Sequence, residues 1–425
     1  MADDFRLEAS LKGYPLTAAP CLVSEIGARG WNVLAGDLPL PLAVLRRGAL
    51  EHNLAWMQRY VGERGVWLAP HGKTTMSPEL LAMQLAAGAW GLTFANVWQA
   101  QLGVAAGARH ILIANQVLQA DDLAGLDALL AAHVDLRVWF LVDSPRQIEL
   151  IEAWVARHGK GRVFDVLLEL GVAGQRTGCR THEQALQLAR AIAASPAVRL
   201  CGIECYEGLV ATCDSAHDAA AVTDLVRRCA RLAHACDEAA LWAEDEPRIL
   251  LSAGGSAVFD LVLPLLTLQG LSRPVQGVLR SGCYLTHDHG NYQRFVGLVT
   301  EREGLADTLQ PALTVWALVQ SVPETGLALL NAGRRDLSFD IDLPRPVRWA
   351  RAGERLAQAA PASWRVSALN DQHAYLCFDG SGAAPAVGDR VELGISHPCT
   401  TFDKWRWMAV VEDDGAVSGA IHTCF

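Results

Sequence analysis

The sequence predicts a (β/α)8 barrel of the TIM type followed by a β-rich domain. Between residues 60 and 285, short apolar runs alternate with Ala- and Leu-rich segments of helix length. Near-continuous apolar strands separated by helices indicate a parallel sheet covered on both faces, and eight such units close into a barrel. After about residue 290, strand-like runs follow one another with little helix between them. This change of pattern predicts a second, β-rich unit.

The predicted barrel strands are apolar runs, most of them rich in β-branched residues. They are Val66–Pro70, Trp90–Ala95, His110–Ala114, Leu136–Val142, Phe164–Leu170, Leu200–Tyr206, Ile249–Ser252 and Val275–Leu279. Helical patterns lie between them at Pro78–Ala87, Val97–Ala106, Asp121–Ala132, Arg146–Arg157, Glu183–Ala194 and His217–Ala240. An open doubly wound sheet is the alternative, but no Gly-x-Gly-x-x-Gly motif follows the first strand.

The β-rich unit is predicted from six strand-like runs and from turn signals at Gly388-Asp389 and Asp413-Asp414-Gly415. The runs are Thr314–Val322, Leu327–Leu330, Trp364–Leu369, Ala374–Phe378, Asp389–Ile395 and Trp405–Val411. We therefore expect the barrel at residues 39–285 and the β-rich domain at residues 286–425.

Composition excludes several classes of protein. With 425 residues, of which 51% are hydrophobic, the chain can fill the cores of about two domains. The net charge of −10 and the absence of a basic run argue against a nucleic-acid partner. No apolar stretch reaches the roughly 18 residues of a membrane span, and the start of the chain lacks the pattern of a signal peptide. Eleven cysteines without framework spacing then suggest reduced thiols in a cytoplasmic protein.

The first barrel strand ends in His71-Gly72-Lys73, and Ser77-Pro78-Glu79 then opens a helix. Barrel enzymes carry their chemistry at the carboxyl ends of the strands. Burial there would lower the pKa of Lys73 and free its amine to form a Schiff base with a carbonyl compound. The alternative is an ordinary strand-end lysine with a solvated ammonium group.

Glycine-rich loops follow the seventh and eighth predicted strands, where barrels often bind phosphate. Gly254-Gly255-Ser256 comes at the head of an apolar segment that we expect to be helical, and Arg280-Ser281-Gly282-Cys283 follows the next strand. Backbone N–H groups and a helix dipole would bind an anion here, although Gly-Gly-Ser alone is also a common turn or cap. A reactive amine opposite a phosphate site suits pyridoxal 5′-phosphate. Arg176, Tyr206 and Arg280 could then contact its ring edge and phenolate.

A metal site is predicted at His397-Pro398-Cys399. Residues two apart in an extended segment point to the same side, and the proline favours extended geometry for His397. Imidazole and thiolate suit Zn²⁺, and two protein ligands leave positions open for a substrate. The alternative is a strand-end histidine beside a buried cysteine. His373 could be a third ligand or a loop residue, and the run Thr286–His289 could bind metal or simply connect the domains.

These motifs, in their order and spacing, resemble the fold-type III pyridoxal-phosphate enzymes with an alanine racemase-like fold, and specifically the D-serine dehydratase / D-threonine aldolase-like family. The resemblance extends over nearly the whole chain. It rests on His71-Gly72-Lys73-Thr74, Arg176-Thr177-Gly178, Tyr206 with Gly208, Gly254-Gly255-Ser256, Gly282-Cys283-Tyr284, Asn331-Ala332-Gly333, Gln372-His373 and His397-Pro398-Cys399.

The resemblance implies a cofactor-binding barrel, a metal-binding β-domain that residues 1–38 join, and a homodimer. The cofactor-binding residues would be Lys73, His71, Arg176, Tyr206, Gly254, Gly255, Ser256, Arg280, Gly282 and Cys283, with His397 and Cys399 as metal ligands. Arg176 would contact the phenolate, and Arg280 the pyridine nitrogen. In such dehydratases the pair is His and Cys with zinc, whereas aldolases more often have Asp and a harder divalent ion. Cys399 thus favours dehydration.

The expected function is conversion of a D-β-hydroxy amino acid, D-serine first, into a 2-oxo acid and ammonia. Lys73 would remove the Cα proton, and zinc or another divalent cation would bind the β-hydroxyl. The alternatives are retro-aldol cleavage of D-threonine-like substrates and dehydration of 3-hydroxyaspartate. Arg280 and His287 depart from the eukaryotic dehydratase pattern and resemble a bacterial deaminase subgroup, which leaves the substrate open. A racemase would need no metal, so the His397–Cys399 pair counts against one. A pyridoxal-phosphate carrier would consist of the barrel alone, so the residues of the β-rich domain argue against that alternative.

Overall fold

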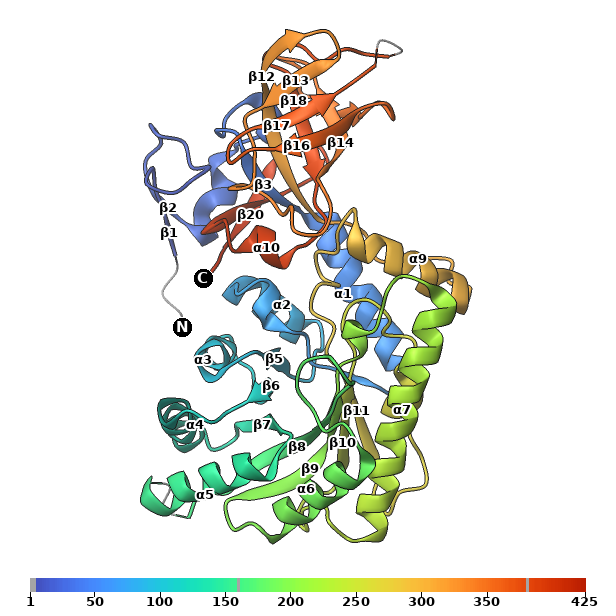
Figure 1. Ribbon diagram of the computed structural model, residues 1–425. Coiled ribbons are helices and arrows are strands. Elements are labelled where there is room, and N and C mark those ends of the chain that lie inside the picture. The colour runs from blue at the N-terminus through green and yellow to red at the C-terminus, as the bar shows by residue number, and fades with distance from the viewer. Residues whose placement is uncertain (1–4, 159–160, 380–381) are drawn as a thin grey trace.

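The protein consists of a parallel barrel and a β-rich domain at its open end (Figure 1). This computed structural model describes residues 5–158, 161–379 and 382–425. Among the described residues, one sheet has eight strands, all paired in parallel, and a second has ten, paired almost entirely antiparallel; a third sheet has two antiparallel strands near the amino terminus. The expected fold class is confirmed. In the part of the chain described, no helix is long and apolar enough to span a membrane.

The barrel strands match the predicted runs to within a few residues. They are β4 (Trp67–Leu68), β5 (Leu92–Phe94), β6 (His110–Gln116), β7 (Arg137–Val142), β8 (Phe164–Leu170), β9 (Val198–Cys205), β10 (Ile249–Ala253) and β11 (Val275–Leu279). Their order is β4-β11-β10-β9-β8-β7-β6-β5. The two end strands are joined by the Thr93 N–H, which donates to the Pro70 carbonyl at 2.8 Å, and the Trp90 N–H, which donates to Leu68 at 2.9 Å. These bonds nearly close the barrel.

Helices surround the barrel strands on the outside (Figure 1). They are α1 (Arg47–Gly62), α2 (Pro78–Ala86), α3 (Val97–Ala105), α4 (Ala120–Ala132), α5 (Pro145–His158), α6 (His182–Ala194), α7 (Ser215–Glu238) and α8 (Leu263–Leu266), with short 3₁₀ turns η3 (Gly72–Thr74) and η4 (Glu207–Leu209). Inside the barrel, Leu112, Trp139, Leu167 and Leu250 belong to one buried apolar cluster. The barrel is therefore filled by side chains, and its chemistry is confined to one end.

The β-rich domain is built from strands of two to twelve residues that pair almost entirely antiparallel. They are β12 (Leu313–Glu324), β13 (Leu327–Leu330), β14 (Arg345–Ala350), β15 (Gln358–Ala359), β16 (Arg365–Leu369), β17 (Ala374–Cys377), β18 (Arg390–Gly394), β19 (Trp407–Val411) and β20 (Val417–His422). Two helices accompany them, α9 (Asn291–Glu303) and α10 (Cys399–Phe402). All six runs predicted for this domain are strands.

The sequence analysis missed several strands, among them β14 and β20, and one of the missed strands, β3 (Leu42–Arg46), decides how the two units are joined. β3 precedes α1, yet it pairs antiparallel with β12 and parallel with β19 in the β-rich sheet. Because its partner strands lie far away in sequence, this run of five residues could not be assigned to a sheet from local pattern. The predicted boundaries at residues 38 and 285 stay predictions.

The amino-terminal segment packs on the β-rich domain, as the family resemblance implies. It contains β1 (Arg6–Leu7), β2 (Cys21–Leu22), η1 (Val23–Arg29) and η2 (Val33–Ala35). The indole N–H of Trp407 donates to the Lys12 carbonyl at 2.9 Å, and the Val417 N–H donates to Trp31 at 2.8 Å.

The carboxyl-terminal strand ties the β-rich domain to the start of α2. His422 Nδ1 lies 2.6 Å from Glu79 Oε1, and the Cys424 N–H donates to the Met76 carbonyl at 2.8 Å. Although burial opposes it, hydrogen bonding to Cys424 and Glu79 raises the pKa of His422 to about 9. The same hydrogen bond outweighs burial and lowers the pKa of Glu79. The pair therefore links two domains through charge.

We expect this pair to make stability depend on pH. Because the pKa of His422 is raised by folding, its stabilisation is complete below the unfolded value of about 6.5 and is lost as pH rises through about 9. The contribution of Glu79 is present above its unfolded value of about 4.5 and is lost on acidification below it.

Between about pH 6 and about pH 9.5 the melting temperature of His422→Gln should therefore fall less than that of the unchanged protein. The exposed His217→Gln is the control. If His422→Gln shows the same pH dependence as the unchanged protein, the pair does not link the domains energetically.

Candidate functional site

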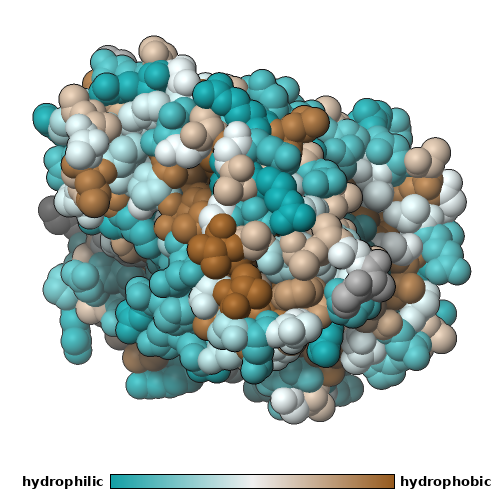
Figure 2. Space-filling view, turned by 90° about the horizontal axis from the view of Figure 1, so that it is seen from above, coloured by the Kyte–Doolittle hydropathy of each residue, from teal (hydrophilic) through white to brown (hydrophobic). Residues whose placement is uncertain are grey.

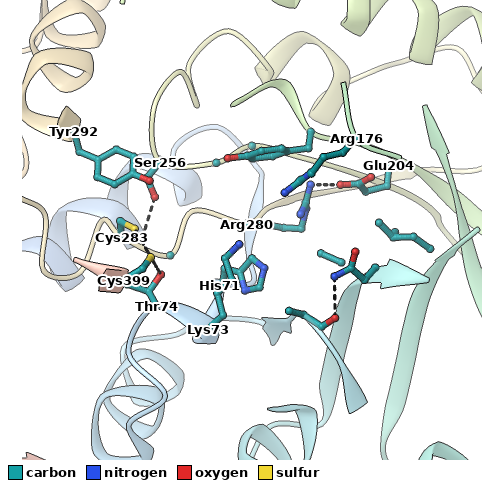
Figure 3. Close-up of a pocket in the computed structure, with 18 of the residues that line it drawn as sticks. His71, Lys73, Thr74, Arg176, Glu204, Ser256, Arg280, Cys283, Tyr292 and Cys399 are labelled. Carbon is teal, nitrogen blue, oxygen red and sulfur yellow. Dashed lines mark hydrogen bonds and ion pairs between the residues drawn. The ribbon is translucent and has the colours of Figure 1, made fainter. Parts of the chain in front are cut away.

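One cavity at the carboxyl ends of the barrel strands is lined by every residue that the sequence analysis assigned to the cofactor and the metal. Figure 3 shows this cavity and labels several of these residues. The volume of the cavity is about 210 Å³. The barrel contributes His71, Lys73, Arg176, Tyr206, Gly254, Gly255, Ser256, Arg280, Gly282 and Cys283, and the β-rich domain contributes His397 and Cys399. The cavity thus lies between the two domains.

Lys73 projects into this cavity from η3, directly after β4. The expectation of a buried lysine is wrong, because its side chain is exposed to the open cavity. The loop that carries it is fixed instead. Thr74 is buried, and Met76 adopts φ 43° while its carbonyl accepts the Cys424 N–H. A left-handed conformation at a non-glycine residue is held only where its surroundings enforce it.

A buried ion pair forms the inner wall. The Arg280 guanidinium donates to Glu204 Oε1 and, at 3.0 Å, to the Cys205 carbonyl. Burial raises the pKa of Glu204, whereas the Arg280 guanidinium lowers it and so favours the charged pair. Burial and the positive charges of Lys73 and Arg280 lower the pKa of His71 well below its ordinary value. His71 is therefore neutral at physiological pH.

Three buried polar atoms of this wall lack a partner within the described ranges: His71 Nδ1, Glu204 Oε2 and Arg280 Nε. Unpaired buried polar atoms are costly, and in native proteins they mark functional sites or absent ligands. A ligand with several polar atoms, such as pyridoxal phosphate, fits this wall and the lysine opposite it.

The glycine loop after β10 binds a carboxylate of the protein itself, that of Glu207, where the sequence analysis expected a phosphate. The Gly254 and Gly255 N–H groups donate to the Glu207 carboxylate at 3.0 and 2.8 Å. A Cβ at Gly254, where φ is 95°, would lie 2.2 Å from Leu279 Cδ1, so only glycine fits. A phosphate has to displace Glu207 or use the neighbouring groups of the two loops.

The expectation that Gly-Gly-Ser opens a helix is wrong. Residues 256–262 form bends and turns, and the helix that follows, α8, has four residues. The helix dipole expected to favour an anion at this loop is therefore missing, because no regular helix begins there. Ser256 Oγ instead accepts the Cys283 N–H at 3.0 Å, which joins the loops after β10 and β11.

Arg176 and Tyr206 cover the opposite side of the cavity. The Arg176 guanidinium lies 4.8 Å from the centre of the Tyr206 ring. Burial and the neighbouring Glu207 raise the pKa of Tyr206 to about 12, so it carries its proton. In the portion described, Arg176 has no carboxylate within ion-pair distance, which leaves its charge available to an anion.

The histidine–cysteine pair comes together in a different way from the one expected. Pro398 is helical, with φ −57° and ψ −45°, and caps α10, so the segment is not extended. His397 Nδ1 lies 2.6 Å from Asp340 Oδ2. Despite burial, hydrogen bonding to Cys399 and Asp340 raises the pKa of His397 to about 9. Hydrogen bonding to Cys283 and His397 outweighs burial and lowers the pKa of Cys399 well below that of an ordinary thiol.

This donor set fits a metal ion. A thiol that ionises readily supplies a soft ligand, and an imidazole held through Nδ1 by a carboxylate offers Nε2. Elsewhere among residues with known placement, Asp165, Cys201 and Glu246 have ligand atoms within 4.8 Å of one another. Arg137 pairs with both of these carboxylates, so that group is a salt-bridge network.

The other histidines considered from the sequence do not reach the cavity. His373 lies in a turn, where its carbonyl accepts the Asn370 N–H at 2.9 Å. Asp288 accepts backbone N–H groups of Gly290, Tyr292 and Gln293 at the start of α9. The segment around Asp288 therefore positions α9.

Sequence analysis missed several residues of the site: Thr74, Glu204, Glu207, Tyr292 and Asp340. Glu204 and Glu207 flank Tyr206 at the end of a predicted strand, which was a usable signal. Asp340 lies in an irregular segment 57 residues before His397, so no pattern could pair them.

Comparison with known proteins gives two family matches. Residues 45–260 match the model of the alanine racemase N-terminal domain, and residues 312–411 match that of a putative serine dehydratase domain. The first match covers the barrel as far as the loop after β10, and the second covers most of the β-rich sheet.

Similar curated proteins and solved structures cover nearly the whole chain. D-threonine aldolase of Arthrobacter sp. is 28% identical over 384 residues, covering 88% of this chain and 89% of that protein. D-threo-3-hydroxyaspartate dehydratase of Delftia sp. strain HT23 is 26% identical over 391 residues, covering 89% and 96%. The structure of a D-threonine aldolase from Filomicrobium marinum aligns with a TM-score of 0.77 at 25% identity, covering 93% and 97%.

Proposed function

This chain belongs to the D-serine dehydratase / D-threonine aldolase-like family of fold-type III pyridoxal-phosphate enzymes, and from that premise we propose that it dehydrates and deaminates a D-β-hydroxy amino acid. The substrate we propose is D-serine, and the products are a 2-oxo acid and ammonia. Pyridoxal 5′-phosphate and a divalent cation, zinc first, are the proposed cofactors.

One observation carries the proposal: Lys73 and the His397–Cys399 pair line the same cavity. A racemase or decarboxylase needs a proton-transfer group beside the cofactor, but elimination of hydroxide also needs an acid at the β-oxygen, since hydroxide is a poor leaving group. A structure of a variant of a D-threo-3-hydroxyaspartate dehydratase has been described as the metal-free form. A form described as metal-free implies that this relative also has a metal-bound form, which supports a metal site in the family.

When bound, pyridoxal phosphate would stabilise the electron pair left at Cα, and the cation would polarise the β-hydroxyl. The residues of the chain then have separate tasks. The Lys73 amine, freed by the substrate, removes the Cα proton. His397 and Cys399 would hold the cation, with Asp340 orienting the imidazole through Nδ1.

The cofactor's surroundings follow from the ion pairs of the wall. Glu204 holds Arg280 in place, and the unpaired atoms Glu204 Oε2 and Arg280 Nε are both candidates to face the pyridine nitrogen. Arg176 would contact the phenolate edge or the substrate carboxylate. His71, kept neutral by burial and the nearby charges, can donate or accept a hydrogen bond without adding charge.

The balance of charge in the cavity supports a substrate with one carboxylate. Arg280 is neutralised by Glu204, His71 is neutral, and Lys73 and His397 have tasks of their own. Arg176 is the remaining cation among the lining residues of the described chain. A second carboxylate, as in 3-hydroxyaspartate, would find no cation to pair with.

Retro-aldol cleavage is the second candidate, because D-threonine aldolases are among the similar proteins. Aldol cleavage removes a proton from the β-hydroxyl, whereas dehydration expels that hydroxyl. The soft thiolate of Cys399 favours zinc, a stronger Lewis acid than the harder ions, and so supports dehydration.

The test is an assay of the purified, cofactor-loaded protein with D- and L-serine, D-threonine and D-threo-3-hydroxyaspartate. We expect a 2-oxo acid and ammonia from D-serine, at least tenfold faster than from 3-hydroxyaspartate, which corresponds to about 1.4 kcal/mol for the missing charge partner. Chelation should stop turnover while the cofactor absorbance stays, and zinc should restore it. Glycine and an aldehyde as the main products, or full activity after thorough chelation, would refute dehydration by a metal.

We also propose a homodimer. Phe339, Ile341 and Leu343 are 42%, 43% and 37% exposed in one irregular segment of the β-rich domain, and Asp340 within it holds His397. Seen from the β-rich end, the molecule carries an apolar patch within a largely hydrophilic surface (Figure 2). Exposed apolar side chains beside an active site are typical of an interface that completes the site.

Analytical ultracentrifugation should give a dimer for the unchanged protein and a shift toward monomer for Ile341→Glu. Val134→Glu is the matched control, because Val134 is exposed on the far side of the barrel, before β7. A monomeric unchanged protein at micromolar concentration would contradict the dimer.

A further inference from the structure

Two thiols from different domains, those of Cys283 and Cys399, lie in contact at the proposed metal site (Figure 3). Cys283, in the loop after β11, has its sulfur 3.8 Å from the sulfur of Cys399, at the start of α10. A disulfide bond has a length of about 2.05 Å, so these are two separate thiols in contact. Two sulfurs bound to one tetrahedral zinc ion, each at about 2.3 Å, lie about 3.8 Å apart. The observed separation is the one that a shared ion requires.

We propose that Cys283 is a further ligand of the metal, so that this chain binds the ion through two thiolates and one imidazole. The inference rests on the proposed metal site at His397 and Cys399 and extends it. In this proposal Cys283 binds the metal through its side chain, whereas the sequence analysis expected it to bind the cofactor phosphate through its backbone N–H.

The backbone of Cys283 is fixed so that its thiol faces Cys399. Its N–H donates to Ser256 Oγ at 3.0 Å, and its carbonyl accepts the His287 N–H at 2.7 Å. A phosphate that used the Cys283 N–H would have to break the bond to Ser256. Both polar groups of the backbone are therefore engaged, and only the thiol, which faces Cys399, is left to bind a metal ion.

Apart from each other, the two sulfurs have hydrogen-bonding partners in Tyr292, which contacts Cys283, and His397, which contacts Cys399, and both sulfurs lie near Thr74. Thr74 Oγ1 lies 3.6 Å from the Cys283 sulfur and 3.5 Å from the Cys399 sulfur. Thiols are poor hydrogen-bond donors and acceptors, and Cys283 is 5% exposed. A metal ion would replace these weak contacts by two strong bonds. Thr74, next to Lys73, would then keep the ion close to the reacting carbon.

The imidazole is oriented to complete the set. His397 Nδ1 is held by Asp340 at 2.6 Å, which leaves Nε2 for the metal. The ring already hydrogen-bonds to Cys399, but within the described residues its nitrogen and both sulfurs do not all lie within 4.8 Å of one another, so a shared ion would require the ring to move toward Cys283. Two Cys and one His are a known ligand set of catalytic zinc, with the fourth position open for a substrate oxygen.

The test uses Co²⁺ added to the chelated protein, because cobalt–thiolate bonds absorb in the near ultraviolet in proportion to their number. We expect Cys283→Ser and Cys399→Ser each to lose about half of this absorbance, and the double variant to lose all of it. Cys283→Ser should also bind zinc at least tenfold more weakly, in line with the loss of one ligand. Cys236→Ala, a buried thiol on α7, is the control that should change neither value.

X-ray absorption of the zinc-loaded, unchanged protein gives a count that needs no variant. Two sulfur neighbours at about 2.3 Å support the proposal. One sulfur neighbour overturns it and leaves the proposed function standing, as does a Cys283→Ser variant with undiminished cobalt absorbance. Failure of the unchanged protein to bind either metal overturns both this inference and the proposed metal-dependent function.

Discussion

The arrangement of this protein depends on the pairing of one short strand. β3 is inserted between β12 and β19 in the sheet of the β-rich domain, and the next residue, Arg47, begins the first helix of the barrel. Because β3 is hydrogen-bonded on both edges, it cannot slide or detach without breaking the sheet. The β-rich domain is thereby held at the carboxyl end of the barrel, where α10 brings His397 and Cys399 to the cavity that Lys73 enters.

The cavity itself is organised by charges that the protein pairs in advance. Arg280 and Glu204 form a buried ion pair, and Glu207 occupies the amides of the glycine loop. Such buried pairs add little net stability, but removing one partner leaves an unpaired buried charge, which is strongly destabilising. What remains open is Arg176, the three unpaired wall atoms and the sulfur pair. These open groups lie along one cavity, with the lysine between the ion-pair wall and the proposed metal ligands (Figure 3).

Much of the fold could be predicted from the sequence, because the barrel is built from local patterns. All eight strands, and the helices between them, follow from apolar runs that alternate with helical periodicity. The strand β3 could not be predicted, because its partners are far away in sequence. The site residues were also predictable as types at strand ends, and all of them meet in one cavity.

Their detailed geometry was less accessible. The extended His397–Cys399 segment, the helix after Gly255 and the buried Lys73 were all expected from local preference, and in each case tertiary packing prevails. Glu207 illustrates this. The N–H groups of the two glycines were expected to bind a phosphate, but the fold places the Glu207 carboxylate against them. Sequence pattern identifies the groups, whereas the contacts between the loops decide what each group binds.

The proposed function depends above all on Lys73 as the residue that carries pyridoxal phosphate in this cavity. Reduction of the cofactor-loaded protein with borohydride, followed by peptide mapping, tests it directly, because reduction fixes the cofactor on its lysine. The chain has only four lysines, Lys12, Lys73, Lys160 and Lys404, so the assignment is unambiguous. We predict one pyridoxyl group per chain, on Lys73, and none in Lys73→Ala. Modification of another lysine, or an unchanged yield in Lys73→Ala, would contradict the account.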